Sequence, residues 1–338
     1  MANRGKETGH LVLPGGQELT PASYLVSVPV FSPREIDDRL NVLGYRGQEE
    51  ARRRVCLCAY RHVKRLRSIY LEKMSRSMVP NRSNALIIGP TGCGKTYIIE
   101  LLFGEILKLP CVITEMTKYT ESGYVGDDVV NIINQLIDAA HGRVDVAQCG
   151  IVALDEFDKI AGSVSNLAFR GSGTNKDVSG YGVQRELLKI LEGADIIVPR
   201  DYRMTCYSVR DEISTRDITF FALGAFSGFV GDGFGTKNVG FKPGPADTAA
   251  GKISYSLEEG QAENVYNFQN YGFLPELIAR FTYVVPFKPL DSETLMKILE
   301  IRVHNYEQEF RSEGIELRIE DDVRALIVDD ALKKETGA

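Results

Sequence analysis

The sequence lacks any long hydrophobic run. None of its apolar stretches reaches the ~18 residues that a membrane-spanning helix needs, although 43% of its 338 residues are hydrophobic. The first thirty residues contain Arg4 and Lys6 but no sustained apolar stretch, which is not the pattern of a secretory signal peptide. We therefore expect a cytoplasmic protein with no membrane partner.

Paired cysteines are also missing. The six cysteines are scattered along the chain without a C-x-x-C pair, and the four histidines form no partner motif. A structural zinc site needs such close pairs of ligands, so we expect no zinc site. Scattered cysteines in a cytoplasmic protein are typical of reduced, structural thiols.

The chain has no excess of positive charge. Its formal net charge of −6 argues against general binding to nucleic acid. Residues 51–70 are locally basic, but their apolar positions recur at helical spacing. This pattern predicts an amphipathic helix whose charged face is solvated or contacts a neighbouring subunit. The apolar positions are Val55, Ala59, Val63 and Leu66.

Short apolar runs that alternate with helical stretches are present instead. Each run suits one buried strand, and the alternation predicts an α/β fold with a parallel sheet covered by helices on both faces. The runs occupy residues 84–89, 110–114, 150–155, 218–224 and 283–287.

The chain divides into three parts. Residues 1–32 have few periodic positions and are expected to form a weakly structured tail. Residues 33–288 contain the alternating pattern of a large α/β domain, with a loop rich in Gly and Pro at 231–252. Residues 289–338 contain two helical patterns and are expected to begin a smaller helical domain.

The motif GPTGCGKT follows the first apolar run and opens a helix. Its pattern G-x-x-x-x-G-K-[ST] is typical of a phosphate-binding loop, because glycines let backbone N–H groups point at phosphate beside a helix N-terminus. Lys95 would reach the β- and γ-phosphates of ATP, and Thr96 would bind Mg²⁺. The predicted loop consists of Gly89, Pro90, Thr91, Gly92, Cys93, Gly94, Lys95 and Thr96.

Two adjacent acids follow the third apolar run, in IVALDEFDKI. Asp155 would lie at the carboxyl end of a buried strand, where it can hold Mg²⁺ through water, and Glu156 can polarise an attacking water. Adjacent acids at a strand end can also be mere helix-capping groups. Because the phosphate-binding loop is present, we favour catalysis.

Hydrolysis also needs positive charge near the γ-phosphate. Arg280, at the end of a short predicted helix after Pro275, is a candidate for this role from another subunit. The alternative is a surface cation at a helix end, which the helix dipole favours.

Several motifs, in register, resemble the AAA+ unfoldases of the Clp/Hsp100 type, most closely the ClpX group, with the HslU group a near relative. The similarity runs from about Pro33 to the C-terminus. It covers GPTGCGKT, TESGYVGDDV (120–129), GIVALDEFDKI, KDVSGYGVQRELLKILEG (176–193), GAFSGF (224–229) and YGFLPELIARF (271–281). The resemblance implies an AAA+ P-loop NTPase fold followed by a helical small domain, a homohexamer, and the use of ATP with Mg²⁺.

The resemblance also implies roles for three loops. One would be the pore loop that grips a polypeptide in the central channel, although an apolar pair in a loop more usually packs into a core. A second pore loop would face the channel, and a third loop would dock an apolar anchor into a ClpP-type peptidase. The residues are Gly123, Tyr124, Val125 and Gly126 in the first loop, Lys176 and Asp177 in the second, and Val239, Gly240 and Phe241 in the third.

Other matches and departures follow from the same resemblance. Arg280 matches the arginine finger that acts on a neighbouring subunit. Tyr45 and Arg46 stand where the family has two aliphatic residues, and they would meet the adenine base. The channel-entrance loop is expected to be shortened to residues 198–212. The zinc-binding N-terminal domain of the ClpX group has no counterpart, and the small domain is expected to be truncated before the arginine-bearing second sensor.

These features predict an ATP-dependent protein unfoldase and translocase that threads polypeptides through a hexameric pore and feeds a ClpP-type peptidase. One alternative is a remodelling chaperone that acts without a peptidase, and an HslU-like pairing with another peptidase also stays open. A nucleic-acid-directed AAA+ motor is a further alternative. It is disfavoured because Asp127 and Asp128, which follow the apolar pair, would repel a phosphate backbone.

Overall fold

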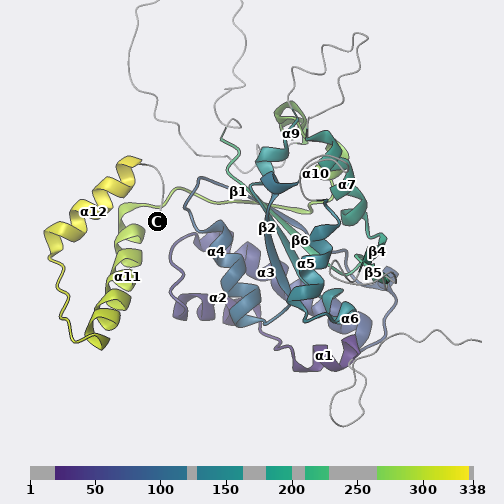
Figure 1. Ribbon diagram of the computed structural model, residues 1–338, viewed down its shortest axis with the longest axis horizontal. Coiled ribbons are helices and arrows are strands. Elements are labelled where there is room, and N and C mark those ends of the chain that lie inside the picture. Colours follow the sequence, from purple (N-terminus) through teal and green to yellow (C-terminus); the bar gives the residue numbers. More distant parts are fainter. Residues whose placement is uncertain (1–19, 120–127, 163–179, 200–209, 228–264, 335–338) are drawn as a thin grey trace, which may run out of the picture.

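The computed structural model describes residues 20–119, 128–162, 180–199, 210–227 and 265–334, and it forms an α/β domain followed by two helices (Figure 1). The five predicted strands form one five-stranded sheet in the order β2-β3-β6-β1-β7, with every neighbouring pair parallel. The prediction of a parallel sheet is therefore confirmed. The strands are β1 (Ala85–Ile88), β2 (Cys111–Glu115), β3 (Ile151–Asp155), β6 (Thr219–Gly224) and β7 (Tyr283–Pro286).

Alternate residues of the central strands face two separate hydrophobic cores. In β1, Leu86 and Ile88 join the core under α5, α7, α9 and α10, whereas Ala85 and Ile87 join the core under α1 to α4. All four side chains are fully buried, as expected for a strand that is covered on both faces. The helices of the first core are α5 (Asn131–Ala139), α7 (Tyr181–Glu192), α9 (Val265–Tyr271) and α10 (Pro275–Ile278), and those of the second are α1 (Pro21–Ser27), α2 (Pro33–Val42), α3 (Glu49–Tyr70) and α4 (Lys95–Ile99).

Several shorter elements complete the described part of the domain. They lie between the longer helices and the strands along the chain. They are the helix α6 (Val144–Ala147), the 3₁₀ turns η1 (Arg76–Met78), η3 (Met116–Lys118) and η4 (Phe157–Ile160), and the π-helical segment η2 (Glu100–Ile106) that continues α4.

The N-terminal segment is more ordered than the sequence predicted. Residues 20–28 were expected in a weakly structured tail, but α1 is a regular helix, with Thr20 as its N-cap accepting a hydrogen bond from the Ser23 backbone N–H. Leu25 is fully buried, and the hydroxyl of Tyr24 donates to the Lys108 carbonyl at 2.9 Å. The prediction was wrong here because a seven-residue helix offers little periodicity, and burial of Leu25 stabilises it. Residues 1–19 lie outside the described part.

A two-stranded antiparallel sheet was also missed. β4 (Asp195–Pro199) pairs with β5 (Arg210–Ser214), with Val198 opposite Asp211. The ends of the predicted channel-entrance loop are therefore strand residues. β5 is mostly polar, and the apolar run of β4 at 196–198 is not covered on both faces, since Ile197 is 59% exposed.

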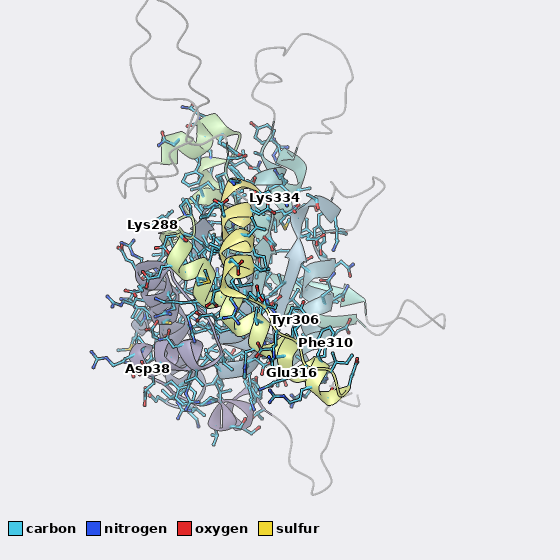
Figure 2. The ribbon with its side chains drawn as sticks, turned by 90° about the vertical axis from the view of Figure 1, so that its left-hand side faces the viewer. Asp38, Lys288, Tyr306, Phe310, Glu316 and Lys334 are labelled. Atoms are coloured by element: carbon cyan, nitrogen blue, oxygen red, sulfur yellow. The ribbon has the colours of Figure 1, made fainter. Side chains whose placement is uncertain are left out.

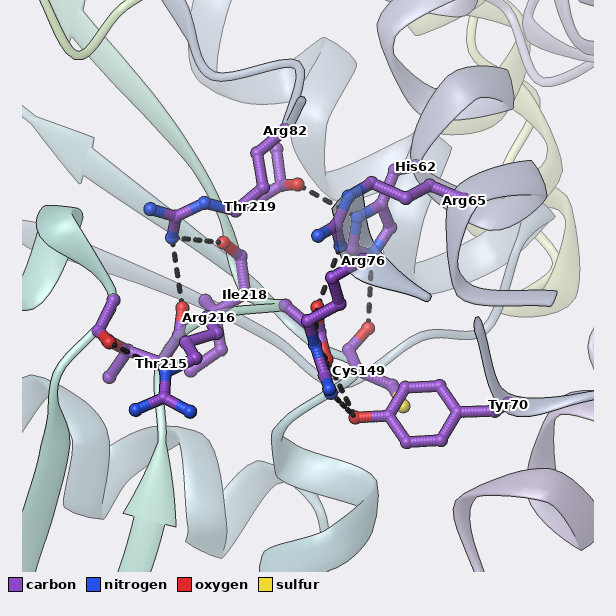
Figure 3. Close-up of polar contacts among 12 residues, drawn as sticks. His62, Arg65, Tyr70, Arg76, Arg82, Cys149, Thr215, Arg216, Ile218 and Thr219 are labelled. Atoms are coloured by element: carbon purple, nitrogen blue, oxygen red, sulfur yellow. Dashed lines mark hydrogen bonds and ion pairs between the residues drawn. The ribbon is translucent and has the colours of Figure 1, made fainter. Parts of the chain in front are cut away.

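The basic helix α3 is amphipathic, as predicted. Its apolar positions Val55, Ala59, Val63 and Leu66 are all buried. Its C-terminal end also carries charged and polar groups that turn inward, toward the amino end of β6 (Figure 3).

Asp217 is the centre of that inward network. Its buried carboxylate accepts hydrogen bonds from Arg65 (2.8 Å), Tyr70 (2.8 Å) and Arg76 (2.6 Å). Burial by itself raises the pKa of the Asp217 carboxyl, but the hydrogen bonds from Arg76, Arg65 and Tyr70 outweigh burial and hold the pKa below its usual range. Part of the basic charge in residues 51–70 thus stabilises the fold, because Arg65 pairs with a buried carboxylate.

The two predicted C-terminal helices form a small helical unit. α11 (Ser292–Ser312) and α12 (Asp321–Lys334) pack against each other beside the α/β domain (Figure 1). Figure 2 looks onto this side and labels Lys288, just after β7, and Tyr306 and Phe310 on α11. Few side chains of this unit are buried, and Tyr306 is 54% exposed. Within the described residues, no helix is long and apolar enough to cross a membrane.

Candidate nucleotide-binding site

The predicted phosphate-binding loop connects β1 to α4. Gly94 is the residue before the helix, and its φ of +91° lies in the left-handed region that favours glycine. A Cβ at this position would also approach the hydroxyl of Tyr45 to 3.0 Å. The loop conformation therefore depends on glycine, and the N-terminus of α4 points its free N–H groups at the site where a phosphate would bind.

Lys95 lies inside this loop. Its ammonium group donates hydrogen bonds to the carbonyls of Gly89 and Pro90, both at 2.7 Å, and the residue is 8% exposed. A buried ammonium needs such acceptors, and phosphate oxygens would be stronger ones. The side chain is thus already placed at the loop that would hold an anion.

Thr96, in the first turn of α4, contacts Asp155, the last residue of β3. The Thr96 hydroxyl donates to a carboxylate oxygen of Asp155 at 2.7 Å, and the other oxygen accepts from the Glu156 backbone N–H at 2.8 Å. β6 lies between β1 and β3, and all three strands are parallel. The loop after β1 and the end of β3 therefore lie at the same end of the sheet, where the strands have their carboxyl ends. A hydroxyl and a carboxylate in contact offer the hard oxygen ligands that suit Mg²⁺.

Glu156 has an unusual backbone. Its φ of +52° is in the left-handed region, which costs a non-glycine residue on the order of 1 kcal/mol or more. Its side chain is exposed and lines the same cavity as the loop. The strained turn directs this carboxylate away from the core, whereas the following residue, Phe157, is fully buried.

These groups line one cavity of about 760 Å³, which has room for a nucleotide. One wall is the phosphate-binding loop with Asp155 and Glu156, and a second wall is residues 43–46. The third wall comes from the small helical unit and includes Leu295, Ile298, Leu299, Arg302, Asn305, Ile327 and Val328. Both parts of the chain therefore line the cavity.

Tyr45 and Arg46 lie in this cavity wall. Tyr45 is almost fully buried, its hydroxyl donates to the Gly94 carbonyl at 3.2 Å, and burial raises its pKa. The Arg46 guanidinium donates to the backbone carbonyls of Asn41 (2.6 Å) and Tyr45 (3.1 Å). Tyr45 thus supports the phosphate-binding loop, and contact of both residues with an adenine base stays a prediction.

Arg280 is not part of this cavity. It follows α10, as predicted, and its guanidinium pairs with Glu192 at the end of α7, at 2.6 Å. Both side chains are nearly half exposed, at 44% and 48%. This surface position suits a residue that acts on another subunit, and that role stays a prediction.

The residues predicted for the pore and the peptidase lie outside the described part of the chain. They are Gly123, Tyr124, Val125 and Gly126, Lys176 and Asp177, and Val239, Gly240 and Phe241. The helix that follows the first of these loops is described: α5 buries Ile132, Ile133, Leu136 and Ile137.

Asp158 and Lys159 also line the cavity, although neither was predicted as a site residue. The Asp158 carboxylate accepts from the Ala225 backbone N–H at 3.2 Å and lies 3.5 Å from the Lys159 ammonium. Asp158 thus links the end of β3 to the end of β6. The spacing D-E-x-D is visible in the sequence, but only the fold brings the Ala225 backbone N–H to the Asp158 carboxylate.

The small-domain wall was missed as well. Ile298, Arg302 and Asn305 line the cavity from α11. Their spacing of about one helical turn was a signal for a shared face, but nothing in the sequence indicated that this face turns toward the phosphate-binding loop.

Comparisons with known proteins agree with this architecture. The chain matches the AAA domain (Cdc48 subfamily) over residues 81–284 and the C-terminal, D2-small domain, of ClpB protein over residues 290–338. It is 35% identical over 335 residues to the ATP-dependent Clp protease ATP-binding subunit ClpX of Azotobacter vinelandii, covering 95% of this chain and 72% of that protein.

Two further relatives have similar names. The chain is 34% identical over 326 residues to the ATP-dependent Clp protease ATP-binding subunit ClpX of Borrelia duttonii (strain Ly), covering 94% and 73% of the two proteins. It is 35% identical over 311 residues to the ATP-dependent Clp protease ATP-binding subunit ClpX 3 of Methylococcus capsulatus, covering 86% and 69%.

The parallel sheet, the phosphate-binding loop and the cavity closed by a helical unit define a P-loop ATPase of the AAA+ class, an enzyme that hydrolyses ATP. Within that class, the chain belongs to the Clp/Hsp100 type, in the family of the ClpX proteins.

Proposed function

We propose that this protein uses ATP to unfold protein substrates and to translocate them into a ClpP-type peptidase in the cytoplasm. The observation that carries the proposal is the cavity in which the phosphate-binding loop, Asp155 with Glu156, and the small helical unit meet. The names of the relatives, ATP-binding subunits of an ATP-dependent Clp protease, support the same function.

ATP would bind with its phosphates on the loop after β1 and its base near Tyr45 and Arg46. Lys95 would exchange its two backbone carbonyl partners for phosphate oxygens. Thr96 and Asp155 would hold Mg²⁺, Asp155 through water, because their oxygens already lie in contact. The bound ion would neutralise negative charge on the phosphates.

Glu156 is the proposed general base. Its carboxylate lines the cavity beside Asp155 and is exposed, so it can accept a hydrogen bond from a water that attacks the γ-phosphate. Asp158 holds the end of β6 against the same turn and keeps the cavity wall in place.

Arg280 is proposed to complete the site of a neighbouring subunit. Within the described residues its guanidinium pairs with the exposed Glu192, an interaction worth about 1 kcal/mol or less, so it can leave for a phosphate. A finger supplied in trans requires an assembly of like subunits, and we propose a homohexameric ring. Charge stabilisation by such an arginine is worth ~10³–10⁵ in rate in related phosphoryl transfers.

The substrate would be gripped by the loop that contains Tyr124 and Val125. An aromatic and an aliphatic side chain can press on most polypeptide side chains without sequence preference. Gly123 and Gly126 would give this loop the backbone freedom to move with the nucleotide state.

The first test is unfolding of a tagged fluorescent protein by the purified protein with ATP. We expect loss of fluorescence with the wild type, ATP hydrolysis without unfolding for Tyr124→Ala, and ATP binding without turnover for Glu156→Gln. Unfolding by Tyr124→Ala at the wild-type rate would contradict the pore-loop assignment. Turnover by Glu156→Gln at the wild-type rate would contradict the assignment of the base.

A second test adds a ClpP-type peptidase. If Val239, Gly240 and Phe241 dock the peptidase, Phe241→Ala should still unfold the substrate but should not support its degradation. Unfolding by the wild type without any degradation would instead favour a remodelling chaperone that acts alone.

A further inference from the structure

We propose that Gln184 is a positioning residue for the Arg280 finger. It ties the segment that carries Arg280 to the segment that follows Glu156, so that the two groups of one subunit move together. The inference rests on the proposed function, in which Arg280 acts on the site of a neighbouring subunit.

Gln184 lies in the first turn of α7 and is fully buried. Its side-chain amide donates to the Ile160 carbonyl at 2.8 Å and to the Gly272 carbonyl at 3.0 Å, and its carbonyl oxygen accepts from the Leu274 backbone N–H at 2.8 Å. Ile160 ends the turn η4, which begins directly after Glu156, and Leu274 is the N-cap of α10, which precedes Arg280. One side chain thus bridges the two segments.

The two segments also touch through their backbones. The Gly162 N–H donates to the Gly272 carbonyl at 2.9 Å. Gly272 has a φ of +110°, and a Cβ there would collide with the Gly162 carbonyl oxygen. The close approach leaves no space for a side chain, so the segments are held at a fixed separation.

Aromatic packing makes a third connection. Phe157, next to Glu156, stacks on Phe273 with ring centroids 5.0 Å apart and meets Phe281 edge-on at 5.5 Å. Phe281 directly follows Arg280, and all three rings are buried. Close-packed rings of this kind transmit a displacement instead of absorbing it. Movement of the turn after Glu156 therefore reaches the backbone of Arg280.

α7 contacts the segment that carries Arg280 through residues near both ends of the helix. Gln184 fixes the approach to α10 through buried hydrogen bonds, and Glu192, the last residue of α7, pairs with the Arg280 guanidinium at 2.6 Å. The buried contacts are costly to break, whereas the exposed ion pair is weak. The guanidinium can thus leave Glu192 while its backbone keeps the position set by Gln184. Figure 1 shows α7, α9 and α10 gathered at one end of the sheet.

A double-mutant cycle on ATP turnover tests this inference. Gln184→Met keeps the length of the side chain but removes its three hydrogen bonds, and we expect kcat to fall about tenfold. KM should stay within about twofold, because Gln184 does not line the cavity. In the Arg280→Ala background, where single-turnover assays resolve slow hydrolysis, Gln184→Met should have no further effect.

Two outcomes would overturn the inference. One is an unchanged kcat for Gln184→Met, and the other is a further loss of about tenfold when it is added to Arg280→Ala. Arg280→Ala alone tests the proposed function separately: if it hydrolyses ATP at the wild-type rate, the finger assignment fails before Gln184 is considered.

Thr219→Val is the matched control for lost stability. The buried Thr219 hydroxyl donates to Nδ1 of His62 at 2.8 Å, at the amino end of β6 and without contact to Glu192 or Arg280. We expect this variant to lower the melting temperature but to keep the wild-type kcat. If Gln184→Met does not fold, Phe281→Leu probes the same linkage while keeping the core apolar. The same non-additivity with Arg280→Ala is then expected, and additive losses would overturn the inference.

Discussion

Gly94 shows how much of the nucleotide site depends on one backbone conformation. Its φ of +91° disfavours any side chain, and so does the Tyr45 hydroxyl, which would lie 3.0 Å from a Cβ at this position. Gly94→Ala should therefore displace the loop or Tyr45 and lower ATP affinity at least about tenfold. Titration with a fluorescent ATP analogue measures this.

Gly104 provides the control for that prediction. It lies in the helical continuation of α4, and a Cβ there would meet no atom within 4 Å. Gly104→Ala should bind ATP like the wild type and melt at the same temperature or higher. Equal ATP affinity in Gly94→Ala and the wild type would contradict the geometric argument.

His62 makes folding stability depend on pH. The ring is fully buried, with Nε2 donating to the Cys149 carbonyl at 3.0 Å and Nδ1 accepting from the Thr219 hydroxyl at 2.8 Å (Figure 3). Burial lowers the pKa of His62 from 6.5 to about 4, although the Cys149 contact acts against it. The unfolded chain therefore binds a proton that the folded chain does not between about pH 6.5 and 4.

The free energy of unfolding should consequently fall as the pH falls through this window, by about 3 kcal/mol if His62 acted alone. Denaturant titrations at about pH 7 and about pH 4.5 measure the loss, and His62→Gln should remove most of the difference between them. Asp217 does not interfere, because its pKa lies below its usual value of 3.8 and its contribution is lost only at lower pH. An unchanged pH dependence in His62→Gln would contradict the prediction.

At the scale of elements, Asp217 joins α3 and the turn η1 to the start of β6. Removing its charge would leave Arg65 partly buried without its carboxylate, and the side chain of Arg76 would lose the same partner. We expect Asp217→Asn to lower the free energy of unfolding by about 3 kcal/mol, measured by denaturant titration at neutral pH.

Glu50→Gln is the matched control on the same helix. Glu50 pairs with Arg54 at the surface, where the Arg54 side chain is 34% exposed and the Glu50 side chain 67% exposed. Loss of an exposed pair of this kind should cost less than about 0.5 kcal/mol. Equal effects of the two substitutions would mean that Asp217 does not hold the elements together.

Sequence patterns predicted the elements whose side chains are buried on both faces. The five parallel strands were predicted because each is an apolar run between two covering layers. α1 was missed because it is a short helix in which Leu25 alone is buried. β4 and β5 are as long as most of the parallel strands, but they were missed because they pair only with each other and β5 is mostly polar.

At the scale of the whole molecule, residues of α11 line the cavity, so a nucleotide bound there would contact both parts of the chain. Ile298 is one of these residues, and truncating it should remove about 1 kcal/mol of apolar contact. We expect Ile298→Ala to bind ADP about fivefold more weakly, as measured by calorimetry. Tyr306→Ala, on the same helix but exposed and outside the cavity, should bind ADP like the wild type. Equal affinities of the two variants would mean that α11 does not contact the nucleotide.

The sequence by itself determined the class of chemistry. The loop GPTGCGKT and the pair Asp155 and Glu156 are local: each needs only a strand followed by a turn, and each could be recognised from adjacent residues. The contact between Thr96 and Asp155 follows almost directly, because parallel strands bring their carboxyl ends to one edge.

The tertiary structure alone decided how these local pieces are connected. Tyr45 supports the loop through Gly94, α11 closes the cavity, and Gln184 bridges two segments that are far apart in the chain. Each of these contacts depends on the packing of helices against the sheet. The pattern of side chains in the sequence indicates which face of a helix is apolar. Which element packs against that face depends on the packing of the whole core.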